Sequence, residues 1–159
     1  MDLDTHARNL NGGKPGQERF WRRARGAPSL GGMDVAPGTQ TTVERVVEES
    51  DTASVVGSGD VPVLATPRLL ALAEAATVAL LARHLAPGWT TVGTRVELDH
   101  VRATPVGGKV TVRATLAEAN GKRLRFEFEA VDGDGQVVGR GTVHRALVER
   151  ERFLGPTRN

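Results

Sequence analysis

The 159-residue chain contains no cysteine and no tyrosine, and only six of its residues are aromatic. Without cysteine it can form no disulfide, offers no thiol nucleophile and cannot build a zinc site from thiolates. Because lysine is also scarce, few groups titrate between histidine and arginine, and a formal charge of only +2 gives a pI near 9.6. The basic pI is therefore no evidence by itself for a nucleic-acid partner.

Long apolar runs are absent as well. No stretch approaches the roughly 18 residues of a membrane-spanning helix. The N-terminus carries Asp2, Asp4, His6 and Arg8 where a signal peptide has a basic start and an apolar core. We expect a soluble, cytoplasmic protein without a membrane partner.

The positive charge is concentrated near the N-terminus. Residues 1–32 hold six basic and three acidic residues, whereas residues 33–159 hold fifteen basic and sixteen acidic residues. The main part of the chain is thus nearly neutral, unlike a surface that follows a phosphate backbone, and we expect no nucleic-acid partner. Residues 1–38 are rich in Gly and Pro and predict a disordered basic extension. The cluster at 20–25 leaves a nucleic-acid or membrane contact open, although a solvated tail is the simpler interpretation.

From Thr39 onwards the hydrophobic pattern becomes regular. Alternation predicts a short strand over 42–48, and a loop over 49–65 follows. Apolar residues at helical spacing then predict one long helix from Thr66 to about His84, with Thr66 as N-cap and Pro67 in the first turn. Between 69 and 82 every residue except Glu74 is apolar or Thr, so we expect this helix to be buried on most sides.

After Trp89 the hydrophobic period changes to two. It predicts strands over 91–100, 109–118, 124–130 and 136–149, with a type I′ hairpin turn at Asn120-Gly121. An antiparallel sheet of about five strands must bury its apolar face, and the helix is the only element available. We therefore predict an α+β domain over 39–154, in which the sheet wraps around one long central helix, and a flexible tail over 155–159.

Three polar residues interrupt this pattern. Glu74 lies at the edge of the apolar stripe of the helix, where an ionised carboxylate is costly unless it is paired or reaches solvent. His100 ends a strand in phase with its buried face, as a core histidine or a catalytic one would. Thr66 lies at the helix N-terminus, where it could cap the helix and where anions are favoured. Together they supply a carboxylate, an imidazole and a hydroxyl, the groups that activate water or an acyl carbonyl.

The spacing of these residues points to a family. Eight residues separate Thr66 from Glu74, and 26 separate Glu74 from His100. Further characteristic segments are Ala65-Thr66, Val92-Gly93-Thr94, Ala103-Thr104-Pro105 with Gly107, Gly121-Lys122-Arg123-Leu124, and Gly139-Arg140-Gly141-Thr142 with Arg145. With these features, the stretch from about 61 to 153 resembles the hotdog-fold thioesterases of the fluoroacetyl-CoA thioesterase type.

The resemblance implies a hotdog fold and a homodimer, or a tetramer, that hydrolyses an acyl-CoA thioester between its subunits. It places Thr66, Glu74 and His100 in the catalytic positions, gives Gly93 a backbone contact near the acyl carbonyl, and makes Arg145 a candidate substrate-binding residue. It implies no metal and no cofactor, since coenzyme A is part of the substrate. Glu74 would either attack the acyl carbon or activate water, with His100 in proton transfer.

One departure from the family affects specificity. Fluoroacetyl-specific members have aromatic residues ahead of the catalytic threonine, whereas residues 49–65 contain none. We therefore expect another small acyl group, on CoA or on acyl carrier protein. Two alternatives stay open: a hotdog hydratase or dehydratase acting on enoyl or hydroxyacyl thioesters, and a non-catalytic hotdog domain that binds an acyl ligand.

Overall fold

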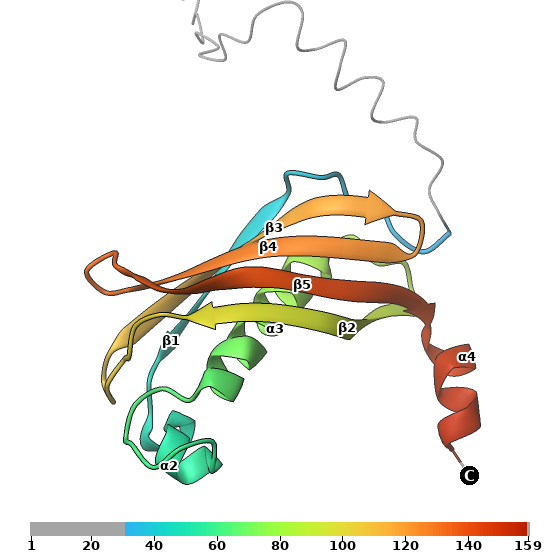
Figure 1. The fold of residues 1–159 in the computed structure, drawn as a ribbon. Coiled ribbons are helices and arrows are strands. Elements are labelled where there is room, and N and C mark those ends of the chain that lie inside the picture. Colours follow the sequence, from blue (N-terminus) through green and yellow to red (C-terminus); the bar gives the residue numbers. More distant parts are fainter. Residues whose placement is uncertain (1–30, 159) are drawn as a thin grey trace, which may run out of the picture.

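The computed structural model describes residues 31–158, which form an antiparallel sheet that curves over one long helix (Figure 1). The strands are β1 (Gln40–Val46), β2 (Trp89–His100), β3 (Lys109–Asn120), β4 (Arg123–Asp132) and β5 (Val137–Glu149). The helices are α3 (Thr66–Leu81) and the short α2 (Ala53–Val56) and α4 (Arg150–Leu154), with 3₁₀ turns η1 (Glu49–Asp51) and η2 (Gly155–Thr157). The predicted α+β fold, a five-stranded sheet around a central helix, is confirmed.

The order of strands in the sheet is β1-β3-β4-β5-β2, and every neighbouring pair is antiparallel. The last three strands form a meander, but β2 pairs with β5 rather than with the next strand along the chain. Consequently β1 and β2 are the two edges of the sheet. Residues 101–108 lead the chain back from the β2 edge to β3, beside β1.

The core lies between α3 and the sheet. Its fully or almost fully buried side chains are Leu69, Ala73, Ala76, Leu80 and Leu81 of α3 and Val110, Val112, Leu116, Leu124, Phe126, Phe128, Val138 and Val143 of the sheet. Each such Leu, Val or Phe contributes about 1.5–3 kcal/mol by its burial. Packing of the helix against the sheet is therefore a major source of stability.

Within residues 31–158, nothing covers the opposite face of α3. The exposed residues of this face are Ala71, Ala75, Val78 and Ala79, and Val78 alone is 50% exposed. The prediction that the helix is buried on most sides is wrong for the part of the chain that the structure describes, because the sheet covers only one side of the helix. The helix also ends at Leu81 rather than near His84.

The hairpin between β3 and β4 differs in detail from the prediction. Asn120 pairs with Arg123, so the two turn residues are Gly121 and Lys122. Only Gly121 has a positive φ, of 60°. A positive φ at the first central residue alone is typical of a type II′ turn. The predicted type I′ turn at Asn120-Gly121 is therefore wrong in type, and the turn begins one residue later than predicted.

The predicted division of the chain into extension, domain and tail stays a prediction, because residues 1–30 and 159 lie outside the described residues. Ahead of the predicted boundary at residue 39, Met33 forms a β-bridge with Leu85, and Met33 and Val35 pack against the core. Packing thus begins several residues before that boundary. In the predicted tail, residues 155–157 form η2.

Candidate functional site

A β-bulge in β2 decides which residues face α3. The register against β5 shifts between Gly93 and Arg95, so that Thr94 is an extra residue. Because of this shift, Gly93 and His100 share the inner face of the sheet although seven residues separate them. Regular alternation over the predicted strand 91–100 would place Val92 and Thr94 on the same face as His100, and the bulge overturns this expectation.

Thr66 and His100 contact each other at one end of the site. The Oγ1 atom of Thr66 lies 2.8 Å from Nδ1 of His100. Thr66 is the first residue of α3, and the N-cap is Ala65, which has no side-chain cap bond. The prediction of Thr66 as N-cap is therefore wrong by one position, and its hydroxyl is directed to the imidazole instead.

His100 is half-buried at the end of β2. Burial lowers the pKa of His100, and an interaction with the backbone of Arg102 offsets only part of this effect. Among the described residues its buried Nε2 has no hydrogen-bond partner. The lowered pKa favours the neutral imidazole at pH 7, and its buried Nε2 is left with unused hydrogen-bonding capacity.

Glu74 is paired, as a carboxylate in this position needs to be. Its Oε2 accepts a hydrogen bond from Nη1 of Arg145 at 3.2 Å, and the side chain is 33% exposed. Arg145 in turn donates from Nε to Oγ1 of Thr91 (2.9 Å) and from Nη2 to the carbonyl oxygen of Thr91 (3.0 Å). Burial lowers the pKa of Arg145, while the charge and hydrogen bond of Glu74 act in the opposite direction.

Gly93 lies directly against this pair. A Cβ atom built on Gly93 would collide with Oε2 of Glu74 and approach Nη1 of Arg145. The glycine thus leaves space that the Glu74 carboxylate occupies.

The predicted site residues accordingly form two groups. Thr66 and His100 make one, and Glu74, Gly93 and Arg145 make the other. Thr66 and Glu74 are eight residues apart on α3, a rise of about 12 Å along the helix axis. The Glu74 carboxylate lies against Arg145 and Gly93 and forms no hydrogen bond with Thr66 or His100 among the described residues.

A cavity of about 350 Å³ opens beside Thr66 and His100. Its other lining residues are Ala53, Ser58, Gly59, Val61, Val63, Leu64, Val101, Arg102 and Ala103. The wall is therefore mainly aliphatic and holds no aromatic side chain, as the composition of residues 49–65 predicts.

The segment ahead of Thr66 is held by an aspartate that the sequence did not single out. Asp51 is 4% exposed and accepts hydrogen bonds from Nε and Nη2 of Arg45 (both 3.1 Å) and from the backbone N–H of Glu48 (2.9 Å). Its carbonyl oxygen accepts from the N–H of Ala65 (2.9 Å), and Leu64 donates to the carbonyl of Thr104 (2.8 Å). These bonds fix the residues that lead into α3.

Sequence reasoning also missed Thr91 and the pairing of Glu74 with Arg145. The sequence did contain a signal for the pairing. Along the strand, Arg145 occupies the same face as Val143 and Leu147, both of which are buried. An arginine in the buried phase of a strand requires an acidic or carbonyl partner, and Glu74 is the acid that α3 supplies.

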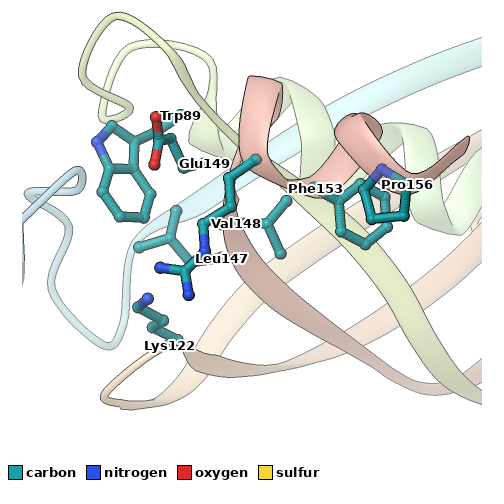
Figure 2. Close-up of a pocket in the computed structure, with 8 residues that line it drawn as sticks. Trp89, Lys122, Leu147, Val148, Glu149, Phe153 and Pro156 are labelled. Carbon is teal, nitrogen blue, oxygen red and sulfur yellow. The ribbon is translucent and has the colours of Figure 1, made fainter. Parts of the chain in front are cut away.

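A second cavity, of about 490 Å³, lies at the other end of β2 (Figure 2). The Nζ atom of Lys122 lies 5.5 Å from the centre of the Trp89 ring, and a Cβ atom on Gly32 would collide with the same ring. Phe153 and Pro156 close another side. None of the predicted site residues lines this cavity.

Within residues 31–158, no group of three or more His, Asp or Glu is arranged to hold a metal ion, and no helix is long and apolar enough to span a membrane.

Comparison with known proteins identifies the family. The model of the fluoroacetyl-CoA-specific thioesterase family (FlK) matches residues 47–151. The chain belongs to this family. It is a hotdog-fold thioester hydrolase, as the spacing of Thr66, Glu74 and His100 suggested.

Individual relatives agree with this assignment. The fluoroacetyl-CoA thioesterase of Streptantibioticus cattleyicolor is 38% identical over 96 residues, which cover 60% of this chain and 68% of the relative. A crystal structure of the fluoroacetyl-CoA-specific thioesterase FlK has a TM-score of 0.73 and 33% identity, covering 79% of this chain and 96% of that one. A Thermus thermophilus protein described as a thioesterase superfamily member has a TM-score of 0.74 and 25% identity, covering 79% and 92%. Mutants of FlK have been solved in complex with acetyl-CoA and with fluoroacetate and CoA.

Proposed function

We propose that this enzyme hydrolyses the thioester of a small aliphatic acyl-CoA, with Thr66, Glu74 and His100 as catalytic residues at the interface of a homodimer. The observation that carries the proposal is the hydrogen bond between Thr66 and His100 at the wall of an aliphatic cavity. CoA is the favoured carrier because FlK, a member of the same family, has been solved with acetyl-CoA and with CoA.

The thioester carbonyl would lie between the two groups of residues. Glu74 either attacks the acyl carbon, giving an acyl–enzyme that water then hydrolyses, or removes a proton from a water molecule that attacks the same carbon. In both routes the carbon–sulfur bond breaks when the tetrahedral intermediate collapses. The water molecule that is consumed loses a proton in either route, and this proton neutralises the departing thiolate, with the neutral imidazole of His100 as relay.

The other polar groups have supporting roles. Thr66 orients the imidazole through Nδ1, and Gly93 leaves the acyl group access to Glu74. A thiolate leaves readily, so the main requirement is a donor where the negative charge of the intermediate develops. We assign this role to backbone N–H groups near Gly93.

The acyl group is expected to be aliphatic. The cavity beside His100 is lined mainly by Ala, Val and Leu side chains. It holds none of the aromatic residues that fluoroacetyl-specific members of the family have ahead of the catalytic threonine. Burial of such a chain contributes about 0.8 kcal/mol per CH₂, so affinity should rise with chain length until the cavity is full.

A dimer is supported by two uncovered features of the chain. Among residues 31–158, the twelve-residue strand β2 pairs only with β5, and long free edges invite pairing with another strand. The face of α3 that includes Ala71, Ala75 and Val78 is exposed and apolar. Two-fold pairing of β2 with β2 of a second copy would cover both features and place Gly93 and His100 near the interface.

A panel of acetyl-, propionyl-, butyryl- and hexanoyl-CoA, assayed by thiol release, tests this function. His100→Ala should lower kcat by at least 100-fold. His84→Ala is the matched control, because His84 bonds the Asp34 carbonyl away from the site. Undiminished turnover by His100→Ala would exclude the assigned role, and loss of an enoyl-CoA double bond without thiol release would indicate a hydratase.

A further inference from the structure

The cavity at the start of β2 is built from three separate parts of the fold (Figure 2). They are Trp89 at the start of β2, Lys122 in the turn between β3 and β4, and the end of β5 with the short helices that follow it. Backbone hydrogen bonds join these parts, from the N–H of Leu147 to the carbonyl of Lys122 (2.7 Å) and from the N–H of Arg150 to the carbonyl of Gly88 (2.9 Å). The cavity is therefore a fixed feature of the fold, and its volume of about 490 Å³ is that of a small-ligand site.

Two cationic side chains, Lys122 and Arg152, line this cavity. Within residues 31–158, neither of them forms an ion pair with a carboxylate. The Nζ atom of Lys122 lies 5.5 Å from the centre of the Trp89 ring, whose electrons attract the ammonium group. Glu149 is the acidic residue of the lining, so the cations are in excess. A lysine and an arginine that converge on one cavity without a carboxylate partner favour an anionic ligand, and phosphate above all.

The rest of the wall is largely apolar. Figure 2 shows Trp89 at one end of the cavity and Phe153 with Pro156 at the other. The Phe153 side chain is 47% exposed, although a benzyl group on a protein surface gains nothing from contact with water. Aromatic side chains next to cations are typical of nucleotide sites, where the base stacks on a ring while the phosphates meet the positive charge. The lining thus fits a ligand that carries both an aromatic base and phosphate groups.

Within one chain this cavity lies far from the candidate active site. Trp89 and His100 are the first and last residues of β2, and an extended strand of that length separates them by roughly 35 Å. The proposed pairing of β2 with β2 of a second copy changes this relation, because antiparallel strands run in opposite directions. If the two strands pair along their length, the start of β2 in one subunit lies beside the end of β2 in the other. The cavity of one subunit then adjoins the Thr66–His100 pair of its partner.

We propose that this cavity binds the phosphorylated nucleotide end of coenzyme A while the acyl group lies in the active site of the other subunit. Lys122 and Arg152 bind phosphate groups, and the adenine lies against the apolar and aromatic wall. Each acyl-CoA molecule is thus bound by both chains of the dimer. The inference rests on the proposed hydrolysis of acyl-CoA and on the proposed homodimer.

A substrate without the nucleotide separates this role from catalysis. Butyryl-pantetheine carries the same thioester as butyryl-CoA but has no phosphate and no adenine. In Lys122→Gln/Arg152→Gln, KM for butyryl-CoA should rise about tenfold or more, while kcat/KM for butyryl-pantetheine stays within about twofold of wild type. Arg150→Gln is the matched control, because Arg150 belongs to the same short helix as Arg152 but does not line the cavity. An equal loss with both substrates, or no loss with either, would overturn the proposal.

A direct titration gives a readout that needs no enzymatic activity. The chain has two tryptophans, Trp21 and Trp89, so the fluorescence of Trp21→Phe reports Trp89 alone. Addition of adenosine 3′,5′-bisphosphate should change this fluorescence saturably, and Lys122→Gln/Arg152→Gln in the same background should bind about tenfold more weakly or worse. The absence of a saturable change would overturn the proposal. A response to inorganic phosphate at the same concentrations would indicate a simple anion site and would overturn the assignment to a nucleotide.

A mixed dimer tests whether the two ends of the substrate bind to different subunits. It joins one His100→Ala chain to one Lys122→Gln/Arg152→Gln chain. In the proposed arrangement, one of its two sites combines an intact His100 with the intact cations of the other chain, so KM for butyryl-CoA should return to within about twofold of wild type. A KM that stays as high as in the double variant would place both ends on one chain and overturn the arrangement. If the wild type hydrolyses no acyl-CoA, the proposed function fails, and the nucleotide titration still reports on the cavity by itself.

Discussion

The hydroxyl oxygen of Thr66 and Nδ1 of His100 lie 2.8 Å apart, although 34 residues separate them in the sequence. The contact joins the first residue of α3 to the last residue of β2, so it exists only when the helix lies against the sheet. Since the N-cap position belongs to Ala65, the Thr66 hydroxyl contributes to the imidazole rather than to the helix end.

This arrangement predicts that Thr66 matters for activity and not for stability. Thr66→Val should lower kcat by at least tenfold, whereas Thr66→Ser, which keeps the hydroxyl, should retain most of it. A capping threonine would cost about 1 kcal/mol on removal, but here urea unfolding should give a change within about 0.5 kcal/mol. A large loss of stability with normal kcat would contradict the assignment.

The pH dependence of the reaction should report His100. Burial lowers its pKa below the ordinary value of about 6.5, and the neutral imidazole is the active form. The acidic limb of the kcat/KM profile should therefore have its midpoint below 6.5, with little change between pH 7 and 8. The same shift makes the folded state bind a proton less readily than the unfolded chain, so His100 should lower the stability as pH falls from 6.5 towards its folded pKa. A midpoint above 6.5 would contradict this.

Gly93→Ala tests the contact between β2 and Glu74. The new Cβ would collide with Oε2 of Glu74, and the carboxylate would have to move, so kcat should fall at least tenfold. Gly133→Ala is the matched control, because a Cβ there meets no atom within 4 Å and its φ is not positive. Equal activities of the two variants would show that the close approach of Gly93 to Glu74 does not matter for catalysis.

Asp51 should stabilise the segment that leads into α3. Burial alone would raise the pKa of Asp51, but hydrogen bonds from Arg45 and the Glu48 backbone, with the charges of Arg45 and Arg68, hold it below its ordinary value. Asp51→Asn should lower the free energy of unfolding by about 1–2 kcal/mol at pH 7. Because the folded pKa is depressed, this contribution exists above the unfolded pKa of about 3.9 and is lost as pH falls through the folded pKa.

Urea unfolding at pH 7 and at pH 3 measures the effect of Asp51. The difference between wild type and Asp51→Asn should shrink at the lower pH. Asp60→Asn, an exposed aspartate in the same loop, should change the stability by less than about 0.5 kcal/mol at either pH. A similar loss in both variants would mean that the Asp51 bonds contribute nothing specific.

The proposed dimer predicts that charge on the exposed face of α3 is disruptive. Val78 and Val106 are both 50% exposed in the single chain. Val78→Arg should shift the mass measured by light scattering towards the monomer, because a buried unpaired charge in an interface is costly, whereas Val106→Arg should not. A monomeric wild type would exclude the dimer.

The fold could be predicted from the local hydrophobic pattern of the sequence. Alternation along residues 109–149 and the apolar spacing from Leu69 to Leu81 specify strands and a helix whatever lies around them, because each element must bury one face. The same reasoning located Thr66, Glu74 and His100, since a polar group in an apolar pattern needs a partner or a function.

What the local pattern could not supply were the relations between distant elements. The bulge at Thr94, the pairing of β2 with β5, the choice of Ala65 as N-cap and the bonds from Arg145 to Glu74 and Thr91 all depend on strands and a helix far apart in the sequence meeting at a particular register. Hydrophobic periodicity tells which face of a residue's own element it occupies, but not which atom of another element it will meet. The sequence by itself thus determined an α+β domain with a hydroxyl, a carboxylate and an imidazole, and only the tertiary structure decided that the hydroxyl serves the imidazole and that an arginine holds the carboxylate.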